Sequence, residues 1–439
     1  MTSSEYAIVA HPTKDLFISM LIKDLSLADA ISDLVDNSVD GARRMGRKTY
    51  KNLKIDIEAA ADSFTIVDNC GGISIDNARN YAFRFGRPDN MPETPGSIGR
   101  FGIGMKRALF KLGGKFRVES TTSTTHFVVD VDVAEWKANQ DVEWQFAFSQ
   151  LDEKLPSVPP AKRGIRINVT ELDRTVSQSF QNPLFLSRLG KNLELHHLFS
   201  IAKGLEIRIN KQLLKRRTLS VMQSKELIPA YWKHRFSDGV TADVYSGIDN
   251  RNLDEGGWYI FCNGRLVLGP DHTLTTGWGD KEMTRIPKYH GQYDRFRGYV
   301  FFEAKDAALL PWNTTKTSVD VDAPKWKFVR AEMIKLMRPV CDFLNKIHQE
   351  RQRDGNNLET TPLEELVEKA KRMELRAAKT ASAFVAPKSL PQITPPKMSR
   401  IQYYKPTAEV NRAKRSLGVK TAIEVGEETF DYYILMELD

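Results

Sequence analysis

The sequence predicts an α+β fold in which helices cover one face of an antiparallel or mixed sheet. Three segments predict this arrangement. Residues 27–44 place apolar side chains at helical spacing, which is typical of an amphipathic helix. Residues 64–73, FTIVDNCGGI, are typical of a short strand that ends in an acid and a glycine turn. Residues 96–114, GSIGRFGIGMKRALFKLGG, combine a glycine-rich loop with a second amphipathic helix.

The first of these helices carries a packing face and a polar stripe. Its apolar positions, which we expect to face a core, are Leu27, Ile31, Leu34, Val35 and Ala42. Asp33, Asn37 and Asp40 fall at i, i+4 and i+7, so they share one side of the helix. An amide oxygen can ligate a metal and a carboxylate can accept a proton from water, which suits a magnesium–nucleotide site. Such a stripe alone is more often a solvated helix face, and the following segments favour the site.

The glycine-rich loop predicts a phosphate-binding segment. Glycine lets the backbone approach a ligand closely, and the start of the following helix offers unpaired N–H groups and a partial positive charge. One glycine cluster predicts only a turn. The three segments together, in this order and spacing, predict a nucleotide site.

In this order, the segments resemble the nucleotide motifs of the GHKL ATPase superfamily, which includes gyrase B, heat-shock-type chaperones, histidine kinases and MutL. The resemblance extends over about the first 350 residues and is nearest to the MutL and MORC branch. It implies a GHKL α/β sandwich that binds ATP and Mg2+. A transducer-like α/β domain and a C-terminal helix with a tail would follow.

The resemblance also implies residue roles. DLVDNSVDG places Asn37 on magnesium and Asp33 as general base for the attacking water. DNCGGI, which includes Gly72, places Asp68 on the amino group of adenine. The phosphate-binding segment GRFGIGMK and the glycine before it supply Gly99, Gly102, Ile103, Gly104, Met105 and Lys106, the last resembling a MORC-type lysine that reaches phosphate oxygens. In LLPWNTTKTSVD, Lys316 resembles the transducer-loop lysine that reaches the γ-phosphate in MutL and gyrase.

Three departures from the family pattern concern this site. Asp33 replaces the usual glutamate and is one methylene shorter, which predicts either slow turnover or a differently placed water. Cys70 stands where a glycine is usual, and we interpret it as a small apolar filler. Ile165 replaces a threonine, so Asp68 lacks one hydroxyl partner, which a water, Thr170 or Ser38 could replace. These departures weaken the expectation of hydrolysis more than that of binding.

Composition narrows the class of protein. The chain has 439 residues, enough for two or three domains, and its three cysteines are too far apart to indicate a disulfide framework or a zinc site. No apolar run approaches the ~20 residues of a membrane span, and the N-terminus lacks a secretory pattern. We therefore expect a cytoplasmic protein without a membrane partner.

The net charge of +8 favours acidic partners, with basic clusters at residues 43–48, 211–217 and 412–415. The charge alone does not distinguish nucleic acid binding from a solvated surface. The resemblance to MutL and MORC favours DNA.

The expected organisation has six parts. They are an N-terminal arm with a first helix (1–26), the ATP-binding domain (27–175), the transducer-like domain (182–352), a helix (359–380), a proline-rich linker (386–406) and a docking tail (407–439). We expect strands at 53–57, 63–67, 115–120, 126–133, 165–170, 205–209, 257–262 and 297–302, and helices at 184–198 and 324–353. Residues 85–98 are expected to form a lid over the nucleotide. The tail ends in FDYYILMELD, a strand-like run that could dock on its own chain, a second copy or another protein.

These features predict an ATP-driven conformational switch, a magnesium-dependent ATPase that forms a homodimer on binding ATP. We expect it to act on DNA or a protein–DNA complex, as in repair or prokaryotic defence. Two alternatives stay open. One is a non-hydrolysing, ATP-gated scaffold, supported by Asp33, Cys70 and Ile165. The other is a heat-shock-type chaperone, which would share the pocket.

Overall fold

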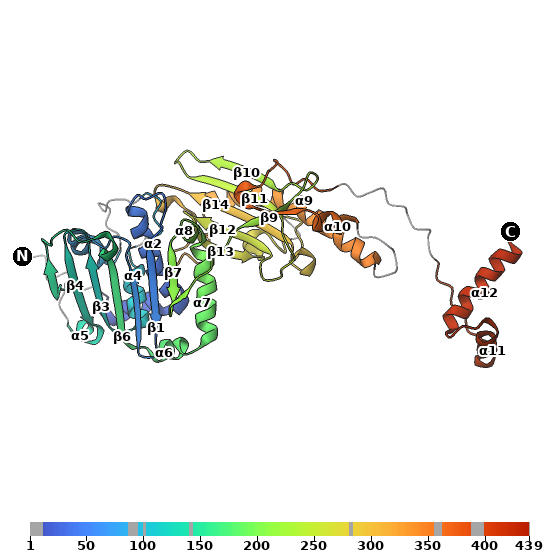
Figure 1. Ribbon diagram of the computed structural model, residues 1–439, viewed down its shortest axis with the longest axis horizontal. Helices are drawn as coiled ribbons and strands as arrows, with labels where there is room; N and C mark the ends of the chain where they lie inside the picture. The colour runs from blue at the N-terminus through green and yellow to red at the C-terminus, as the bar shows by residue number, and fades with distance from the viewer. Residues whose placement is uncertain are drawn as a thin grey trace, which may run out of the picture. The chain divides into compact units, whose positions relative to one another are not determined.

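The computed structural model describes residues 12–86, 95–99, 102–139, 144–280, 284–354, 362–387 and 399–438. The chain divides into two compact units, Met1–Lys388 and Ser389–Asp439. The larger unit contains two main sheets with their helices (Figure 1). None of the described helices combines the length and apolar character needed to cross a bilayer.

The first sheet is mixed and has eight strands in the order β5-β4-β3-β6-β2-β1-β7-β8. Their bounds are β1 Lys54–Ala59, β2 Ser63–Asp68, β3 Gly113–Thr121, β4 His126–Asp132, β5 Gln150–Asp152, β6 Gly164–Leu172, β7 Glu206–Ile209 and β8 Gln212–Leu213. All neighbours pair antiparallel except β1 and β7, which are parallel. The α+β prediction is confirmed.

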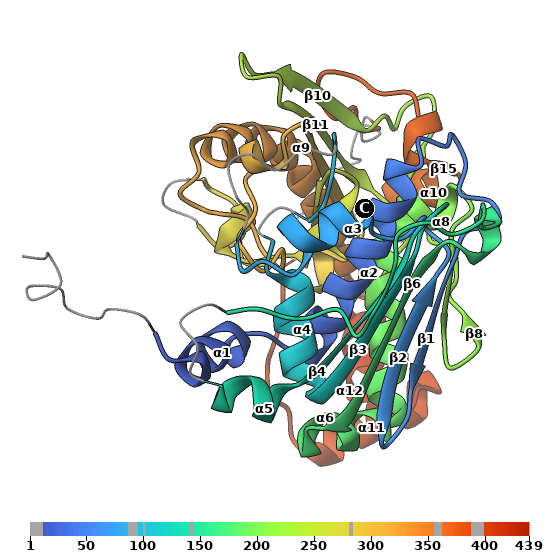
Figure 2. The same ribbon diagram turned by 90° about the vertical axis from the view of Figure 1, so that its left-hand side faces the viewer.

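Helices α2 (Leu27–Arg44) and α4 (Gly104–Leu112) lie together against one face of this sheet (Figure 2). Ser26 caps α2 by accepting a hydrogen bond from the backbone N–H of Asp29 at 3.1 Å. Along α2 four of the five predicted apolar positions are buried, with Ile31 and Val35 at 0% exposure, and Leu27 at the helix start is partly buried. Burial of each such side chain stabilises the fold by roughly 1.5–3 kcal/mol, so this stripe fixes which side of α2 faces the hydrophobic core.

The remaining helices of this half are short, apart from α7. They are α1 Lys14–Lys23, α3 Ile75–Asn77, α5 Val133–Ala138, α6 Arg174–Phe180, α7 Pro183–His196 and α8 Leu198–Ala202. Thr13 and Asn182 cap α1 and α7 with their side-chain oxygens.

The second sheet has the order β10-β11-β14-β12-β13. Its strands are β10 Ala230–Arg235, β11 Thr241–Ile248, β12 Gly257–Cys262, β13 Arg265–Asp271 and β14 Phe296–Glu303. The long helix α9 (Pro324–Asp354) packs against β10, β11 and β14, as Figure 1 shows. The turn between β12 and β13 is the predicted Asn263-Gly264 pair, whose φ values of 48° and 73° suit a tight hairpin.

Two sequence predictions are corrected by these elements. Strand 205–209 forms, but as β7 it extends the first sheet rather than belonging to the second region. The helix expected at 359–380 is only α10 (Pro362–Glu368), and β15 (Lys371–Glu374) follows it. β15 pairs with β9 (Ser220–Gln223), and Arg372 donates to the buried Asp249 at 2.9 Å, so tertiary contacts override the helical pattern.

Residues 430–437 of the C-terminal run FDYYILMELD form a helical stretch rather than a strand. It belongs to α12 (Ala422–Glu437), which follows α11 (Thr407–Leu417) in the smaller unit. Thr421 and Glu424 form a reciprocal capping box at the start of α12, a signal that the strand interpretation overlooked. Parts of several predicted segments lie outside the described residues: the arm at 1–11, the lid at 87–94, the phosphate-binding segment at 100–101, the helix at 359–361 and the linker at 388–398.

Candidate functional site

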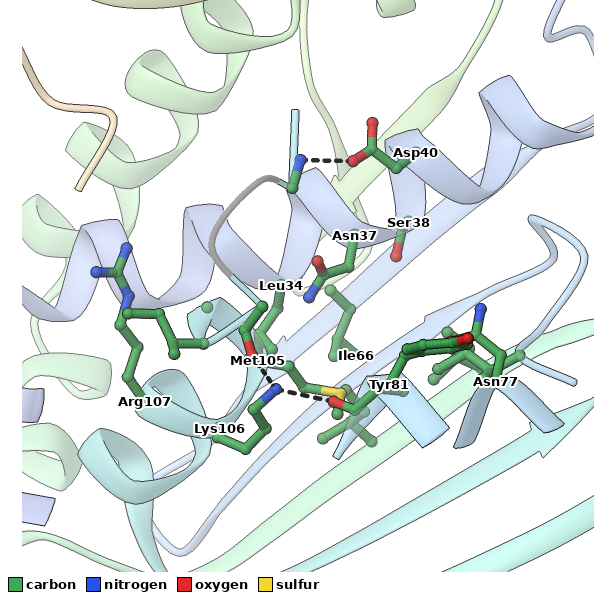
Figure 3. A pocket seen from close by; sticks show the side chains of 18 of the residues that line it. Leu34, Asn37, Ser38, Asp40, Ile66, Asn77, Tyr81, Met105, Lys106 and Arg107 are labelled. Carbon is green, nitrogen blue, oxygen red and sulfur yellow. Dashed lines mark hydrogen bonds between the residues drawn. The ribbon is translucent and has the colours of Figure 1, made fainter. Parts of the chain in front are cut away.

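The candidate site is a pocket between α2, the start of α4 and strands β2 and β6 (Figure 3). Nine of the predicted site residues line it: Asn37, Asp68, Gly99, Gly102, Ile103, Gly104, Met105, Lys106 and Lys316. The other two predicted residues, Asp33 and Gly72, lie just outside the lining. The structure therefore brings together residues that are up to about 280 positions apart in the sequence.

At one end of the pocket, Asp68 ends β2 and is 8% exposed. Its carboxylate accepts hydrogen bonds from the Ser38 hydroxyl at 2.6 Å and from the backbone N–H of Cys70 at 2.8 Å. The backbone N–H of Ile165 is a third donor at 3.3 Å. Ser38 thus supplies the hydroxyl that Ile165 lacks, whereas Thr170 lies in the strand ladder of β6. Burial raises the pKa of Asp68 above its ordinary value.

Close backbone packing holds this end in place. A Cβ on Gly164 would lie 1.9 Å from the carbonyl oxygen of Asp68, so only glycine fits there. Gly72 has φ +75°, and a Cβ there would lie 2.3 Å from the carbonyl oxygen of Thr121. Cys70 is 2% exposed, and burial raises the pKa of its thiol. It is a buried filler, as the sequence predicts.

The glycine segment lies over the other end of the pocket and is tied to α2. The carboxylate of Asp40 accepts from the backbone N–H of Gly99 at 2.7 Å and of Ile98 at 2.9 Å. Burial raises the pKa of Asp40. Beyond the segment, α4 starts without a side-chain cap on its first N–H groups. Uncapped N–H groups at a helix start suit an anion such as phosphate.

The side chain of Lys106 reaches backbone carbonyls beside the helix start. Its ammonium donates to the carbonyl oxygen of Ala82 at 2.9 Å and to that of Gly102 (Figure 3). Within the described part of the chain, no carboxylate forms a salt bridge with it. Burial therefore lowers the pKa of Lys106 to about 7.

Asn37 is half-buried beside the glycine segment, and its Oδ1 lies 3.7 Å from the position of a Cβ on Gly99. Among the described residues, no group of three or more histidine, cysteine or acidic side chains could hold a metal ion. A single amide oxygen nevertheless fits Mg2+ in a nucleotide site, because the phosphates and water supply most of its ligands.

Asp33 lies directly behind the pocket and is 2% exposed. Its Oδ2 accepts from Arg107 Nε at 2.7 Å and Nη2 at 2.6 Å. Its Oδ1 lies 2.9 Å from Nζ of Lys316. Both carboxylate oxygens are therefore paired with cations in this structure.

Asp36 is a buried acid that the sequence interpretation missed. It is 0% exposed and accepts from Lys316 Nζ at 2.6 Å and from Arg265 Nε at 3.1 Å. Burial by itself would raise the pKa of Asp36, but the charges of Arg265 and Lys316 lower it well below its ordinary value. His197 lies 3.5 Å away, and burial lowers its pKa to about 3, so it is neutral. The position of Asp36 next to Asn37 was the only sequence feature that could have indicated its importance. Its partners Arg265 and Lys316 lie in the second sheet and in the loop that adjoins this sheet.

The pocket thereby contacts the second sheet at two points. Lys316, with φ 56°, lies in the loop before α9, and Arg265 begins β13. Arg43 of α2 donates to the carbonyl oxygens of Gly96 and of Asn263, the latter at 2.6 Å. The β12–β13 turn and the glycine segment are therefore joined through one side chain.

Comparison with known families agrees with this geometry. Residues 25–156 match the family described as Histidine kinase-, DNA gyrase B-, and HSP90-like ATPase. The chain therefore carries a GHKL-type ATPase domain in this part. A search of curated proteins finds no match to the chain.

Proposed function

We propose that this chain is a magnesium-dependent ATPase of the MutL/MORC-like type, in which ATP changes the contacts between the first and second sheets. The observation that carries the proposal is the burial of Lys316, from the second half, against Asp33 and Asp36 of α2 beside the pocket. A ligand that competes for this lysine alters the contact between the halves. In this proposal the ATP-binding domain extends through β8, and the transducer-like domain runs from β9 to α9.

In this proposal Asp68 selects the nucleobase of the bound nucleotide. A carboxylate held by Ser38 and two backbone N–H groups accepts a hydrogen bond from the amino group of adenine. Guanine presents a carbonyl oxygen at the equivalent position, which an acceptor repels. The site should therefore prefer ATP to GTP.

The phosphates lie at the glycine segment and the uncapped start of α4, with Asn37 as the protein ligand of magnesium. Gly99, Gly102, Ile103, Gly104 and Met105 offer backbone to the phosphates, and Lys106 supplies positive charge from the next residue. Binding of the metal also neutralises part of the charge on the phosphates.

Hydrolysis requires Lys316 to move. When its ammonium turns from Asp33 to the γ-phosphate, Oδ1 of Asp33 becomes free to accept a proton from the attacking water. The ammonium then stabilises negative charge on the transferred phosphoryl group. The second sheet follows the lysine, which couples nucleotide state to the arrangement of the halves.

A non-hydrolysing switch is the second candidate, because both oxygens of Asp33 are engaged by cations. For the partner we propose DNA or a protein–DNA complex and a homodimer formed with ATP. Two of the basic clusters are partly used internally, since Arg43 holds the glycine segment and Arg217 pairs with Glu194 at 2.8 Å. We expect DNA binding to weaken as the salt concentration rises, because contacts to phosphates release counterions.

The test is ATP hydrolysis with and without double-stranded DNA, alongside binding of ATP and GTP. We expect turnover in the wild type, loss of turnover in Asn37→Ala, and loss of the preference for ATP in Asp68→Asn. Lys335→Ala, which removes an exposed lysine on α9, serves as the control and should behave like the wild type. Tight ATP binding without turnover would favour the non-hydrolysing switch. Equal binding of ATP and GTP by the wild type would refute the assignment of Asp68.

A further inference from the structure

Arg107 has no role in the site as proposed so far, yet its guanidinium is the main partner of Asp33. It lies in the first turn of α4 and is 4% exposed. Nε and Nη2 both donate to Oδ2 of Asp33, at 2.7 and 2.6 Å. The opposite oxygen, Oδ1, faces Lys316. The two cations thus hold different oxygens of one carboxylate.

These two partners differ in how firmly they are attached. Arg107 is part of α4, whose backbone N–H at Arg107 donates to the carbonyl oxygen of Ile103 at 3.0 Å. The start of α4 also packs on the acid, since a Cβ on Gly104 would lie 3.3 Å from Cγ of Asp33. Lys316, by contrast, belongs to a loop in the other half and already shares its ammonium with Asp36.

We propose that Arg107 is a positioning residue that holds Oδ2 of Asp33, so that Oδ1 keeps its direction when Lys316 leaves it. This inference rests on the proposed ATPase function. An aspartate is one methylene shorter than the glutamate usual at this position, so its reach depends more strongly on how its carboxylate is oriented. A guanidinium that donates twice to one oxygen fixes that orientation and leaves the other oxygen for water.

The alternative role for Arg107 is direct contact with the γ-phosphate, because its side chain also lines the pocket. The two roles predict different kinetics. A positioning residue affects kcat and leaves nucleotide affinity nearly unchanged, whereas a phosphate ligand affects the affinity for ATP more than that for ADP.

The experiment uses the full chain with Arg107→Gln, Arg107→Lys, Asp33→Asn and the double variant Asp33→Asn/Arg107→Gln. The structure offers a matched control in Arg295→Gln. Arg295 is 8% exposed and pairs with the buried Glu364 at 3.0 Å, and Arg351 remains as a second cation on Glu364. The control therefore removes one of two cations from a buried acid that does not line the pocket. Thermal unfolding of each variant reports the cost to the fold.

We expect Arg107→Gln to lower kcat by about 100-fold, because a misplacement on the order of 1 Å costs that much. The Kd values for ATP and ADP should stay within about threefold of the wild type, since a positioning residue contributes little uniform binding. Arg107→Lys should recover part of kcat, because an ammonium can donate to Oδ2 from one point. The double variant should be no slower than Asp33→Asn, since both act through the same carboxylate.

Three results would overturn the inference. They are an unchanged kcat in Arg107→Gln, a loss of affinity confined to ATP, and an equal loss of kcat in Arg295→Gln. A wild type that binds ATP and never hydrolyses it would refute the hydrolytic function itself, and the positioning role with it. That result is distinguishable, because it appears before any variant is compared.

Discussion

Asp36→Asn tests the buried contact that joins the two halves of the larger unit. Asp36 is fully buried, and its carboxylate accepts from Arg265 at 3.1 Å and from Lys316 at 2.6 Å. Asparagine keeps the size of the side chain but removes the charge, and its NH2 group then faces two cationic donors. Arg265 is left without its acid, whereas Lys316 keeps Asp33 as a partner.

The expected cost follows from the burial of these charges. Breaking a buried ion pair by removing one partner costs about 3–5 kcal/mol. We therefore expect the free energy of unfolding to fall by about 3–5 kcal/mol in Asp36→Asn, a large part of the roughly 5–15 kcal/mol typical of a domain. Urea unfolding followed by tryptophan fluorescence reports it through Trp258 and Trp326, which are buried in the second half.

Asp56→Asn is the matched control. Asp56 pairs with Lys54 and Arg208, each at 3.3 Å, but its side chain is 33% exposed. Water screens such pairs, so we expect a loss below about 1 kcal/mol. Equal losses in the two variants, or a loss below about 1 kcal/mol in Asp36→Asn, would refute the reasoning.

The sign of the pH dependence follows from the lowered pKa of Asp36. Because the folded pKa lies below the ordinary value of 3.8, the unfolded chain binds the proton more readily. The contribution of Asp36 to the free energy of unfolding is therefore fully present above pH 3.8 and is lost as the pH falls toward the pKa of Asp36 in the folded state. Asp36→Asn should lack this part of the acid-induced loss of stability.

Three further predictions concern the pocket. Binding of ATP at pH 8 should take up as much as one proton, because the charge of the phosphates raises the pKa of Lys106 from about 7. Calorimetry in buffers of different ionisation enthalpy measures this proton uptake. Binding without proton uptake would contradict the prediction. Ser38→Ala should weaken ATP binding by about tenfold, since a hydrogen bond to a charged group contributes about 1.5–3 kcal/mol. Ser38→Thr, which keeps the hydroxyl, is the control. Unchanged binding in Ser38→Ala would contradict the role of Ser38 in holding Asp68. Gly164→Ala should destabilise the fold by about 1–3 kcal/mol in urea unfolding, because its Cβ would lie 1.9 Å from a backbone oxygen. Gly239→Ala is the control, because its site has open space but a φ of +87°, so it measures backbone strain alone. An equal loss of stability in the two variants would contradict the predicted clash.

Local sequence patterns were sufficient to predict the elements whose structure depends mainly on neighbouring residues. The apolar stripe of α2, the acid at the end of β2 and the Asn263-Gly264 turn each depend on neighbouring residues, and the structure has all three. β15 depended instead on its partner strand β9, which lies about 150 positions earlier in the chain. The helix pattern at that point carried no information about this partner.

In the candidate site, too, the features set by neighbouring residues were predicted and those set by distant residues were missed. Nine of the predicted residues line the pocket because the family motifs are short and local. Asp36 and Arg107 were missed because their importance lies in side-chain partners from distant elements: Arg265 lies 229 positions from Asp36, and Asp33 lies 74 positions from Arg107. Ser38 was one of three options for the hydroxyl on Asp68, and only the packing of α2 against β2 selects it.

The central claim is that a γ-phosphate in the pocket acts on the second sheet through Lys316. Hydrogen–deuterium exchange of the backbone amides tests it, measured with ADP and with a non-hydrolysable ATP analogue in the wild type and in Lys316→Ala. We expect the analogue, but not ADP, to change exchange in residues 313–319 and in β13 of the wild type, and to leave both unchanged in Lys316→Ala. Changes confined to the first sheet, or an identical response in Lys316→Ala, would contradict the claim.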